Sequence, residues 1–226
     1  GLAVRWGYLS ANPATGVQPP RPRRRELPVI DEKATVRILA AAESTRLEAP
    51  VAIAIATGMR RGEILGLRWS DLDADWTLAR VQRSLQTAEG LRFEDPKTRR
   101  SRRTVGLPEF LRPYLRRQQG SQLRRAGEMR QGWKENNLVI DKGDGSPMNP
   151  DTLSSNWWYF CRAHDLPKIR FHDLRHAHAT LMLLQGVHPK IVSERLGHAS
   201  IGITLDTYSH VLPAMQEEAV RAFDAL

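Results

Sequence analysis

The sequence predicts an α+β protein that is mainly helical, with a small three-stranded antiparallel sheet. Two observations lead to this prediction. Apolar residues recur at helical spacing in the first third of the chain and again from residue 150 onward. Between them, residues 76–107 hold three short alternating runs separated by turn residues, which is the pattern of a small antiparallel sheet.

Length and cysteine usage limit the class of protein. A chain of 226 residues can bury a core that folds without a disulfide or a metal. The single cysteine, Cys161, excludes a disulfide within the chain and fits a reducing cytoplasm. No apolar run approaches the roughly 20 residues of a membrane span, and the first residues lack the pattern of a signal peptide. We therefore expect a cytoplasmic protein with no membrane partner.

The charge balance indicates the kind of partner. The chain carries a net charge of +9, most of its positive charge coming from arginine. Each phosphate that a basic residue neutralises releases counterions, so a nucleic acid is the partner that this balance favours. On composition alone, a protein that is merely basic remains the alternative.

The first 27 residues are expected to be separate from the domain at 28–226. Residues 1–10 are typical of the end of a helix, and the chain starts within that pattern, as a piece of a longer protein would. Prolines then break regular structure between residues 12 and 22. The arginines here predict either a linker along a phosphate backbone or a solvated arm: Arg21, Arg23, Arg24 and Arg25.

The elements before residue 149 follow from local pattern. A helix is expected at 31–43 with Asp31 as its N-cap, and a fully apolar helix and a shorter one are expected at about 50–57 and 60–68. The three strands are expected at residues 77–81, 91–93 and 103–107. Pro108 begins a long helix, the polar residues 120–136 predict a flexible excursion, and the apolar run 138–140 suggests one more short strand.

After residue 149 the whole sequence has helical character. Gly186 suits the end of one helix and Pro189 the first turn of the next. The expected helices cover about 150–164, 172–185, 189–196, 200–209 and 214–224.

Several residues of this framework could bind a phosphate. Arg60 begins a helix, where backbone N–H groups favour an anion, and Glu63 stands one turn later, where it could orient a cation. His172 and Arg175 are three apart and share a helix face, and a guanidinium binds phosphate through two parallel hydrogen bonds. Taken singly, each pair is also what an ordinary polar helix surface contains.

Tyr208 is the candidate nucleophile. A tyrosine with a pKa of about 10 attacks poorly unless neighbouring cations stabilise its anion. His198 precedes it by ten residues, and Lys97 lies in a turn from which it could protonate a leaving alkoxide. A group of such cations would also stabilise a pentavalent phosphorane. The alternatives are a packed aromatic for Tyr208 and one more cation in a basic loop for Lys97, beside Arg99 and Arg100.

A metal site is not expected. His172 and His176 are four residues apart on a helix, as two zinc ligands can be. A zinc site needs three or four ligands, and no further ligand stands at a recognised spacing.

The order and spacing of three motifs resemble a known family. Residues 57–72, from Thr57-Gly58-Met59-Arg60-Arg61-Gly62-Glu63 onward, resemble the first motif of the tyrosine recombinases, the phage integrase family. His172-Asp173-Leu174-Arg175 resembles their H-x-x-R motif, and residues 196–210, with Gly197-His198 and Tyr208, resemble the last one. The resemblance covers residues 28–212, with residues 1–27 as the remnant of a core-binding domain and its linker. It implies the tyrosine-recombinase catalytic fold.

The resemblance also implies a mechanism. Tyr208 would attack the scissile phosphate and form a 3′-phosphotyrosyl bond, and a partner strand would then attack through a Holliday junction. Arg60 and Arg175 would hold the phosphate oxygens with His198, and Glu63 would support the site. Lys97 would be the general acid, and His172 would assist proton transfer at the tyrosine. No cofactor is implied, because the tyrosyl bond retains the phosphodiester energy.

The implied partners are a duplex DNA attachment or core site, accessory bending or directionality factors, and further copies of the chain. We expect a monomer that forms a homotetramer on DNA, with residues 213–226 as a docking helix, in the nucleoid of a prokaryote or from a phage or mobile element. DNA contacts are expected from the four linker arginines and from Arg99 and Arg100. The alternatives are relaxation of DNA, as by a type IB topoisomerase, and a DNA-binding module without catalysis.

Overall fold

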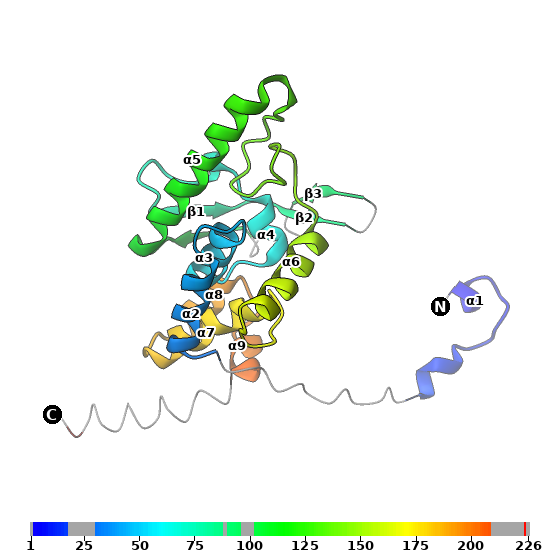
Figure 1. Cartoon of the computed structure of the whole chain (residues 1–226). Helices are drawn as coiled ribbons and strands as arrows, with labels where there is room; N and C mark the ends of the chain where they lie inside the picture. The colour runs from blue at the N-terminus through cyan, green and yellow to red at the C-terminus, as the bar shows by residue number, and fades with distance from the viewer. Residues whose placement is uncertain (1, 18–29, 88–89, 96–101, 209–223, 225–226) are drawn as a thin grey trace.

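The computed structural model describes residues 2–17, 30–87, 90–95, 102–208 and 224. This part of the chain is mainly helical with short antiparallel strands, so the predicted α+β class is confirmed (Figure 1). None of its helices is long and apolar enough to cross a membrane. Several predicted features lie outside the described residues: Lys97, Arg99, Arg100, the four linker arginines and the C-terminal helix.

The N-terminal segment contains α1 (Leu2–Arg5) and a 3-10 turn (Pro13–Gly16) that is capped by the side chain of Asn12. None of the residues in these two elements is buried. The predicted domain boundary at residue 27 stays a prediction.

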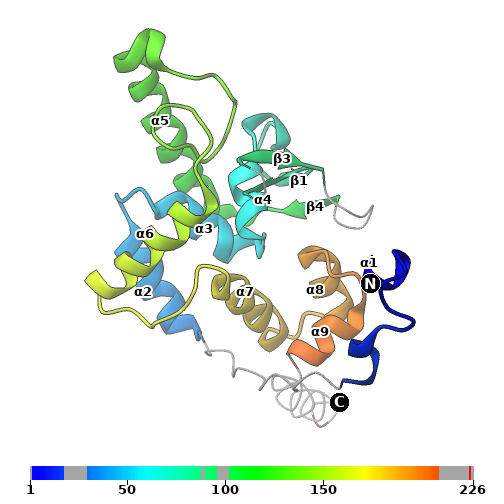
Figure 2. The ribbon, with the colours of Figure 1, turned by 90° about the vertical axis from the view of Figure 1, so that its right-hand side faces the viewer.

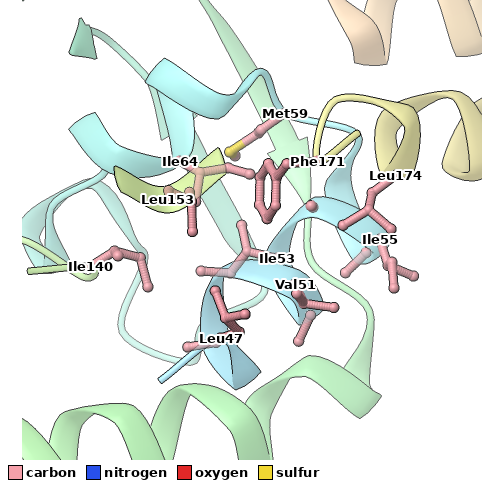
Figure 3. Packing of buried hydrophobic residues seen from close by; sticks show 14 of the residues in the cluster. Leu47, Val51, Ile53, Ile55, Met59, Ile64, Ile140, Leu153, Phe171 and Leu174 are labelled. Carbon is pink, nitrogen blue, oxygen red and sulfur yellow. The ribbon is translucent and has the colours of Figure 1, made fainter. Parts of the chain in front are cut away.

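Helix α3 (Glu48–Thr57) is the centre of the fold, and all of its residues are buried. It contacts α2 (Glu32–Ala42), α4 (Arg61–Gly66), α5 (Arg112–Met129) and α7 (Asp173–Leu184). A helix that is apolar on every side is stable only when other elements surround it. Figure 3 shows its Val51, Ile53 and Ile55 among side chains of other segments, including Met59, Ile64, Leu153, Phe171 and Leu174.

The remaining helices complete one end of the molecule. Helix α6 (Pro150–Ala163) buries Leu153 and Trp157, while α8 (Pro189–Leu196) and α9 (Ile201–Thr207) follow α7. Figures 1 and 2 place α7, α8 and α9 at one end and α5 at the other.

The sheet differs from the prediction of three strands. Strand β1 (Leu78–Val81) pairs with β4 (Arg103–Gly106), and β2 (Ser84–Gln86) pairs with β3 (Arg92–Glu94), both antiparallel. The described residues therefore hold two two-stranded sheets, and β2 was not predicted.

A tertiary ion pair explains this difference. The run that begins with β1 is interrupted at Gln82 and Arg83, where the Arg83 guanidinium bonds the carboxylate of Asp71. One segment thus pairs first with β4 and, beyond the interruption, with β3. The strand predicted at 138–140 is also wrong, since it forms only a single bridge, between Leu138 and Arg68.

The flexible excursion predicted at 120–136 is wrong for residues 120–129, which continue α5. Gln122 is buried in this half of the helix. Its side chain accepts a hydrogen bond from Trp69 Nε1 (2.8 Å) and donates one to the carbonyl of Leu138 (3.0 Å). Polar contacts therefore hold the second half of α5 against the rest of the fold. The apolar periodicity of this half is too weak to predict a helix from the sequence.

Candidate active site

A buried carboxylate lies at the centre of the candidate site. Glu63, in the first turn of α4, is 5% exposed. Its Oε2 accepts from the backbone N–H of Arg60 (2.8 Å), and its Oε1 accepts from Arg60 Nη1 (2.9 Å). Arg103 donates to Oε1 and Oε2 through its two terminal nitrogens at 3.0 and 2.9 Å. Burial works to raise the pKa of Glu63, but hydrogen bonds and charge from Arg103 and then Arg60 lower it below its ordinary value.

Two arginines are held by carbonyl groups at glycine corners. Arg175 donates to the carbonyls of Gly58 (2.7 Å) and Leu196 (2.9 Å). Arg60 Nη2 donates to the carbonyl of Gly197 (3.1 Å). Gly58 ends α3 with φ +63° and Gly197 ends α8 with φ +68°, in the left-handed region that favours glycine. The chain therefore reverses direction at Gly58 and at Gly197, and the carbonyl groups at these two turns accept hydrogen bonds from the two arginines.

Arg175 is a buried cation without a carboxylate of its own in the described part of the chain. It is 3% exposed, and burial followed by the charge of Arg60 lowers its pKa to about 9. This value includes the charge of Glu63, which raises the pKa, and that of Arg103, which also lowers it. A site with this excess of positive charge is complementary to an anion.

Tyr208 follows α9 and is 1% exposed. Its hydroxyl oxygen lies 2.9 Å from Nδ1 of His176, and its ring belongs to a cluster with Leu183, Val192 and Leu196. Burial raises the pKa of Tyr208 to about 12, and the charge of Arg175 works against that rise. Burial also lowers the pKa of His176, which is therefore neutral at pH 7.

The two other predicted histidines lie around this centre. His198 Nδ1 is 2.7 Å from the hydroxyl of Thr204, and burial, followed by Arg175 and Arg60, lowers the pKa of His198 to about 4. A cavity of about 460 Å³ opens beside His198 and Arg103. His172 is exposed before the first turn of α7, and its ring centroid is 5.3 Å from that of His176.

The structure thus brings five predicted residues into one cluster: Arg60, Glu63, Arg175, His198 and Tyr208. His172 stands at its margin, and Lys97 lies outside the described residues. Sequence reasoning did not predict the contacts of Arg103, His176, His178 and Arg195. For Arg103 a signal exists, because strand alternation puts it on the same face as the buried Val105.

His178 and Arg195 join four elements behind the site. His178 Nδ1 lies 2.8 Å from the carbonyl oxygen of Ile55, which can only accept, so Nδ1 carries the proton. Its Nε2 is then free to accept from Arg195 Nε at 3.0 Å. Arg195 Nη2 donates to the carbonyls of Ala56 and Gly106, both at 2.8 Å.

This chain of contacts continues into the site. The carbonyl of Arg195 accepts from Arg103 Nε at 2.6 Å, so the arginine that holds Glu63 is itself held by α8. Burial and then the charge of Arg195 lower the pKa of His178 to about 4. His178 is therefore a neutral structural link at pH 7. Among the described residues, no three His, Cys, Asp or Glu side chains are grouped to hold a metal ion.

The fold and this site define a class of protein, that of the tyrosine recombinase catalytic fold. XerA recombinase matches with a TM-score of 0.66 over 86% of this chain and 64% of its own, at 23% identity. The Tn1549 transposon integrase, solved with a circular intermediate DNA, matches with a TM-score of 0.74 over 98% of this chain and 74% of its own, at 20% identity. At these identities the similarity shows the fold alone.

The chain belongs to the phage integrase family, whose model matches residues 28–215. It is 33% identical to a tyrosine recombinase XerC-like protein of Caldanaerobacter subterraneus subsp. tengcongensis over 99% of this chain. It is 34% identical to the ICEBs1 integrase of Bacillus subtilis over 77% of this chain. The chain spans 62% and 47% of the lengths of these two relatives. The predicted family is confirmed, and the roles of single residues stay predictions.

The neutral state of His178 predicts a pH effect on stability. Its pKa is about 4 in the folded protein and about 6.5 when unfolded, so unfolding takes up a proton between these values. Because of His178, the free energy of unfolding therefore decreases as the pH falls from 6.5 toward 4, by up to about 1.4 kcal/mol per pH unit. We expect His178→Asn to reduce the slope of unfolding free energy against pH by close to one proton between pH 6 and 5, and by less between pH 7 and 6, as measured by urea unfolding at pH 7, 6 and 5.

The matched control for this measurement is His164→Asn, at an exposed position after α6, which removes an imidazole but keeps the contacts of His178 with Ile55 and Arg195. His172 and His198 still contribute in both variants, because burial lowers the pKa of each to about 4. Equal slopes in the wild type and His178→Asn would contradict a neutral buried His178.

Proposed function

We propose that this protein is a site-specific DNA recombinase that breaks and rejoins strands through a bond between Tyr208 and DNA. The observation that carries the proposal is a tyrosine hydroxyl 2.9 Å from a neutral imidazole, in the electrostatic field of a buried arginine that has no carboxylate partner among the described residues. Membership of the phage integrase family supports it. The names of relatives, integrases and recombinases, agree with it.

The reaction is a transesterification. The Tyr208 oxygen attacks the phosphorus of a phosphodiester, a P–O bond to tyrosine forms, and the P–O bond to the 5′-oxygen breaks. The tyrosine proton leaves to a base, and the 5′-oxygen takes up a proton, a step that we assign to Lys97. Arg60, Arg175 and His198 stabilise the charge on the non-bridging oxygens. A 5′-hydroxyl then reverses these steps on a new partner strand.

We assign the first acceptor of the tyrosine proton to His176. Its Nδ1 is in hydrogen-bond contact with the hydroxyl, whereas the resemblance to the family assigns the proton transfer to the more exposed His172. A general base must be within hydrogen-bond reach of the proton that it takes. The rings of His172 and His176 lie edge to face with centroids 5.3 Å apart. His172 is therefore a neighbour of the assigned base, His176, and does not itself contact the tyrosine hydroxyl in our assignment.

The expected partner is duplex DNA in the cytoplasm of a bacterium. We propose that the arginines of the linker and of the β3–β4 connection contact its backbone: Arg21, Arg23, Arg24, Arg25, Arg99 and Arg100. Phosphate contacts of this kind position a protein on DNA and carry no sequence information themselves. The attachment site is found by sequencing DNA that stays covalently trapped on the protein.

Covalent trapping tests the function. On a nicked duplex that carries the trapped site, the 5′-leaving fragment diffuses away, so we expect an SDS-resistant protein–DNA adduct. Tyr208→Phe should abolish the adduct, because it removes the attacking oxygen. The matched control, Tyr159→Phe, changes an exposed tyrosine of α6 and should leave the adduct intact.

Each alternative has its own result in this assay. Site-specific binding without any adduct would mean a DNA-binding module without catalysis. Relaxation of supercoiled DNA without site preference would mean a topoisomerase. An adduct that persists in Tyr208→Phe would overturn Tyr208 as the nucleophile.

Replacing His176 tests the assigned base. His176→Asn keeps a polar group near the hydroxyl but cannot take up a proton at neutral pH. We expect the rate of adduct formation to fall about 10²-fold or more, the usual contribution of a positioned base. The wild-type rate should fall in acid, below the lowered pKa of His176, and this acid limb should be weakened in the variant. A rate that stays the same or rises would mean that His176 only covers the hydroxyl.

We further propose that four copies assemble on DNA and that residues 213–226 dock on a neighbouring copy. Support comes from the apolar residues of this segment, Met215, Ala219, Val220 and Phe223, which a helix would place on one side. Deletion of residues 213–226 should abolish cooperative binding to a two-site DNA in gel-shift titrations while single-site binding persists. Unchanged cooperativity would contradict the docking.

A further inference from the structure

A cavity at the other end of the molecule is lined by arginines from two segments, the connection from α2 to α3 and helix α5. Its volume is about 660 Å³, and its walls are the connection from α2 to α3, one face of α5, and residues 140–148. Figures 1 and 2 place α5 opposite α9, the helix that ends beside Tyr208. None of the candidate catalytic residues lines it. The arginines are Arg46, Arg116, Arg117, Arg124 and Arg125.

The spacing of the arginines on α5 creates the space between them. Arg116 and Arg124 are two turns apart on the helix, as are Arg117 and Arg125, and the residues between them on the same face are Gly120 and Ser121. A Cβ added at Gly120 would meet no atom within 4 Å. The floor of the cavity is therefore lowest at Gly120 and Ser121, and the Cα atoms of the arginines on either side are about 12 Å apart along the helix axis, from the helical rise.

Two of the arginines are fixed by buried carboxylates. Arg117 pairs with Glu48 at 2.6 Å, and Arg125 pairs with Asp141 at 3.0 Å. Both acids are buried, with 8% and 5% of their surface exposed. These pairs neutralise the acids of the cavity wall and set the positions of the two arginines.

The other three, Arg46, Arg116 and Arg124, have no carboxylate within 4.0 Å in the described part of the chain. Arg46 converges with Arg125 on Gly143, whose φ is +126°. A Cβ there would lie 3.1 Å from Arg46 Nη2 and 3.5 Å from Arg125 Nη1. The missing side chain leaves room for two guanidinium groups at the third wall of the cavity.

We propose that this cavity is a second anion site, which binds a phosphate-bearing ligand of about nucleotide size. Guanidinium groups match phosphate oxygens with paired hydrogen bonds. The volume lies within the range of small-molecule sites, and Ile140 and Met148 give the wall an apolar part. The phosphate comes either from a free polyphosphate or nucleotide or from the backbone of a second nucleic acid segment.

The probe for this site is inorganic tripolyphosphate, titrated calorimetrically into the full chain at low salt. Gly120→Leu fills the floor without changing the charge, and Leu favours a helix more than Gly does, so this variant keeps α5. Arg46→Ala/Arg124→Ala removes two unpaired cations. We expect each variant to weaken binding by about tenfold or more, since hydrogen bonds to charged groups are lost.

The matched control is Arg80→Ala, which removes one exposed positive charge from β1, outside the cavity, and should leave the affinity unchanged. Wild-type affinity in Gly120→Leu would overturn the proposal, because it would place the binding elsewhere, including at Arg60 and Arg175. An equal loss in Arg80→Ala would also overturn it, since general charge would then explain the binding. Far-ultraviolet circular dichroism confirms that each variant is folded.

Competition separates the two sources of phosphate. A short duplex that displaces tripolyphosphate from the wild type and from Arg60→Ala alike would identify nucleic acid as the ligand of the cavity. Tripolyphosphate that stays bound while the duplex binds would identify a free anion. Either result supports the site, provided that Gly120→Leu removes the competition or the binding.

Discussion

The paired contact of Glu63 with Arg60 and Arg103 is the interaction on which the candidate site depends. Breaking a buried pair by removing one partner costs about 3–5 kcal/mol, because a charge is left uncompensated. The Arg103 side chain is 7% exposed and the Arg60 side chain 40% exposed. Arg103 is thus an interior residue, while Arg60 is partly exposed. Two of the five N–H groups of the Arg60 guanidinium bind Glu63 and Gly197, and the other three have no hydrogen-bond partner among the described residues. One carboxylate thus fixes a buried and a partly exposed arginine together.

The rest of the site is organised by backbone carbonyl groups. Carbonyl groups at the ends of α3, α8 and β4 accept hydrogen bonds from Arg60, Arg175 and Arg195. At the ends of α3 and α8 the chain turns through a glycine with a positive φ. Carbonyl oxygens orient a guanidinium without neutralising its charge. The positive field therefore remains available, and the donors do not have to reorient when a phosphate arrives. Preorganisation of this kind is worth more in a buried site than on a surface.

These contacts also explain how much the sequence could predict. The apolar α3, the four helices described between residues 150 and 207, and the grouping of five of the motif residues were predictable, because local periodicity and motif spacing carry that information. Residues 120–129 were not, since their helix is attached through Gln122 to Trp69, 53 positions away. Nor were His178 and Arg195, whose partners Ile55 and Ala56 lie 123 and 139 positions away in the chain. The split sheet has the same origin in the Arg83–Asp71 pair. Local pattern does not encode which distant carbonyl or carboxylate a long side chain reaches.

The burial of Tyr208 sets a condition on any chemistry at this site. With a pKa of about 12, ionising the hydroxyl at pH 7 costs about 7 kcal/mol. His176 is a weak base in this setting because its pKa is lowered, so a complete proton transfer before attack would be uphill. A bound phosphate would add negative charge beside the arginines and raise that cost further. In the reaction proposed above, the proton would therefore leave as the bond to phosphorus forms, so that charge passes to the phosphate oxygens that Arg60 and Arg175 are proposed to hold and no free tyrosinate is required.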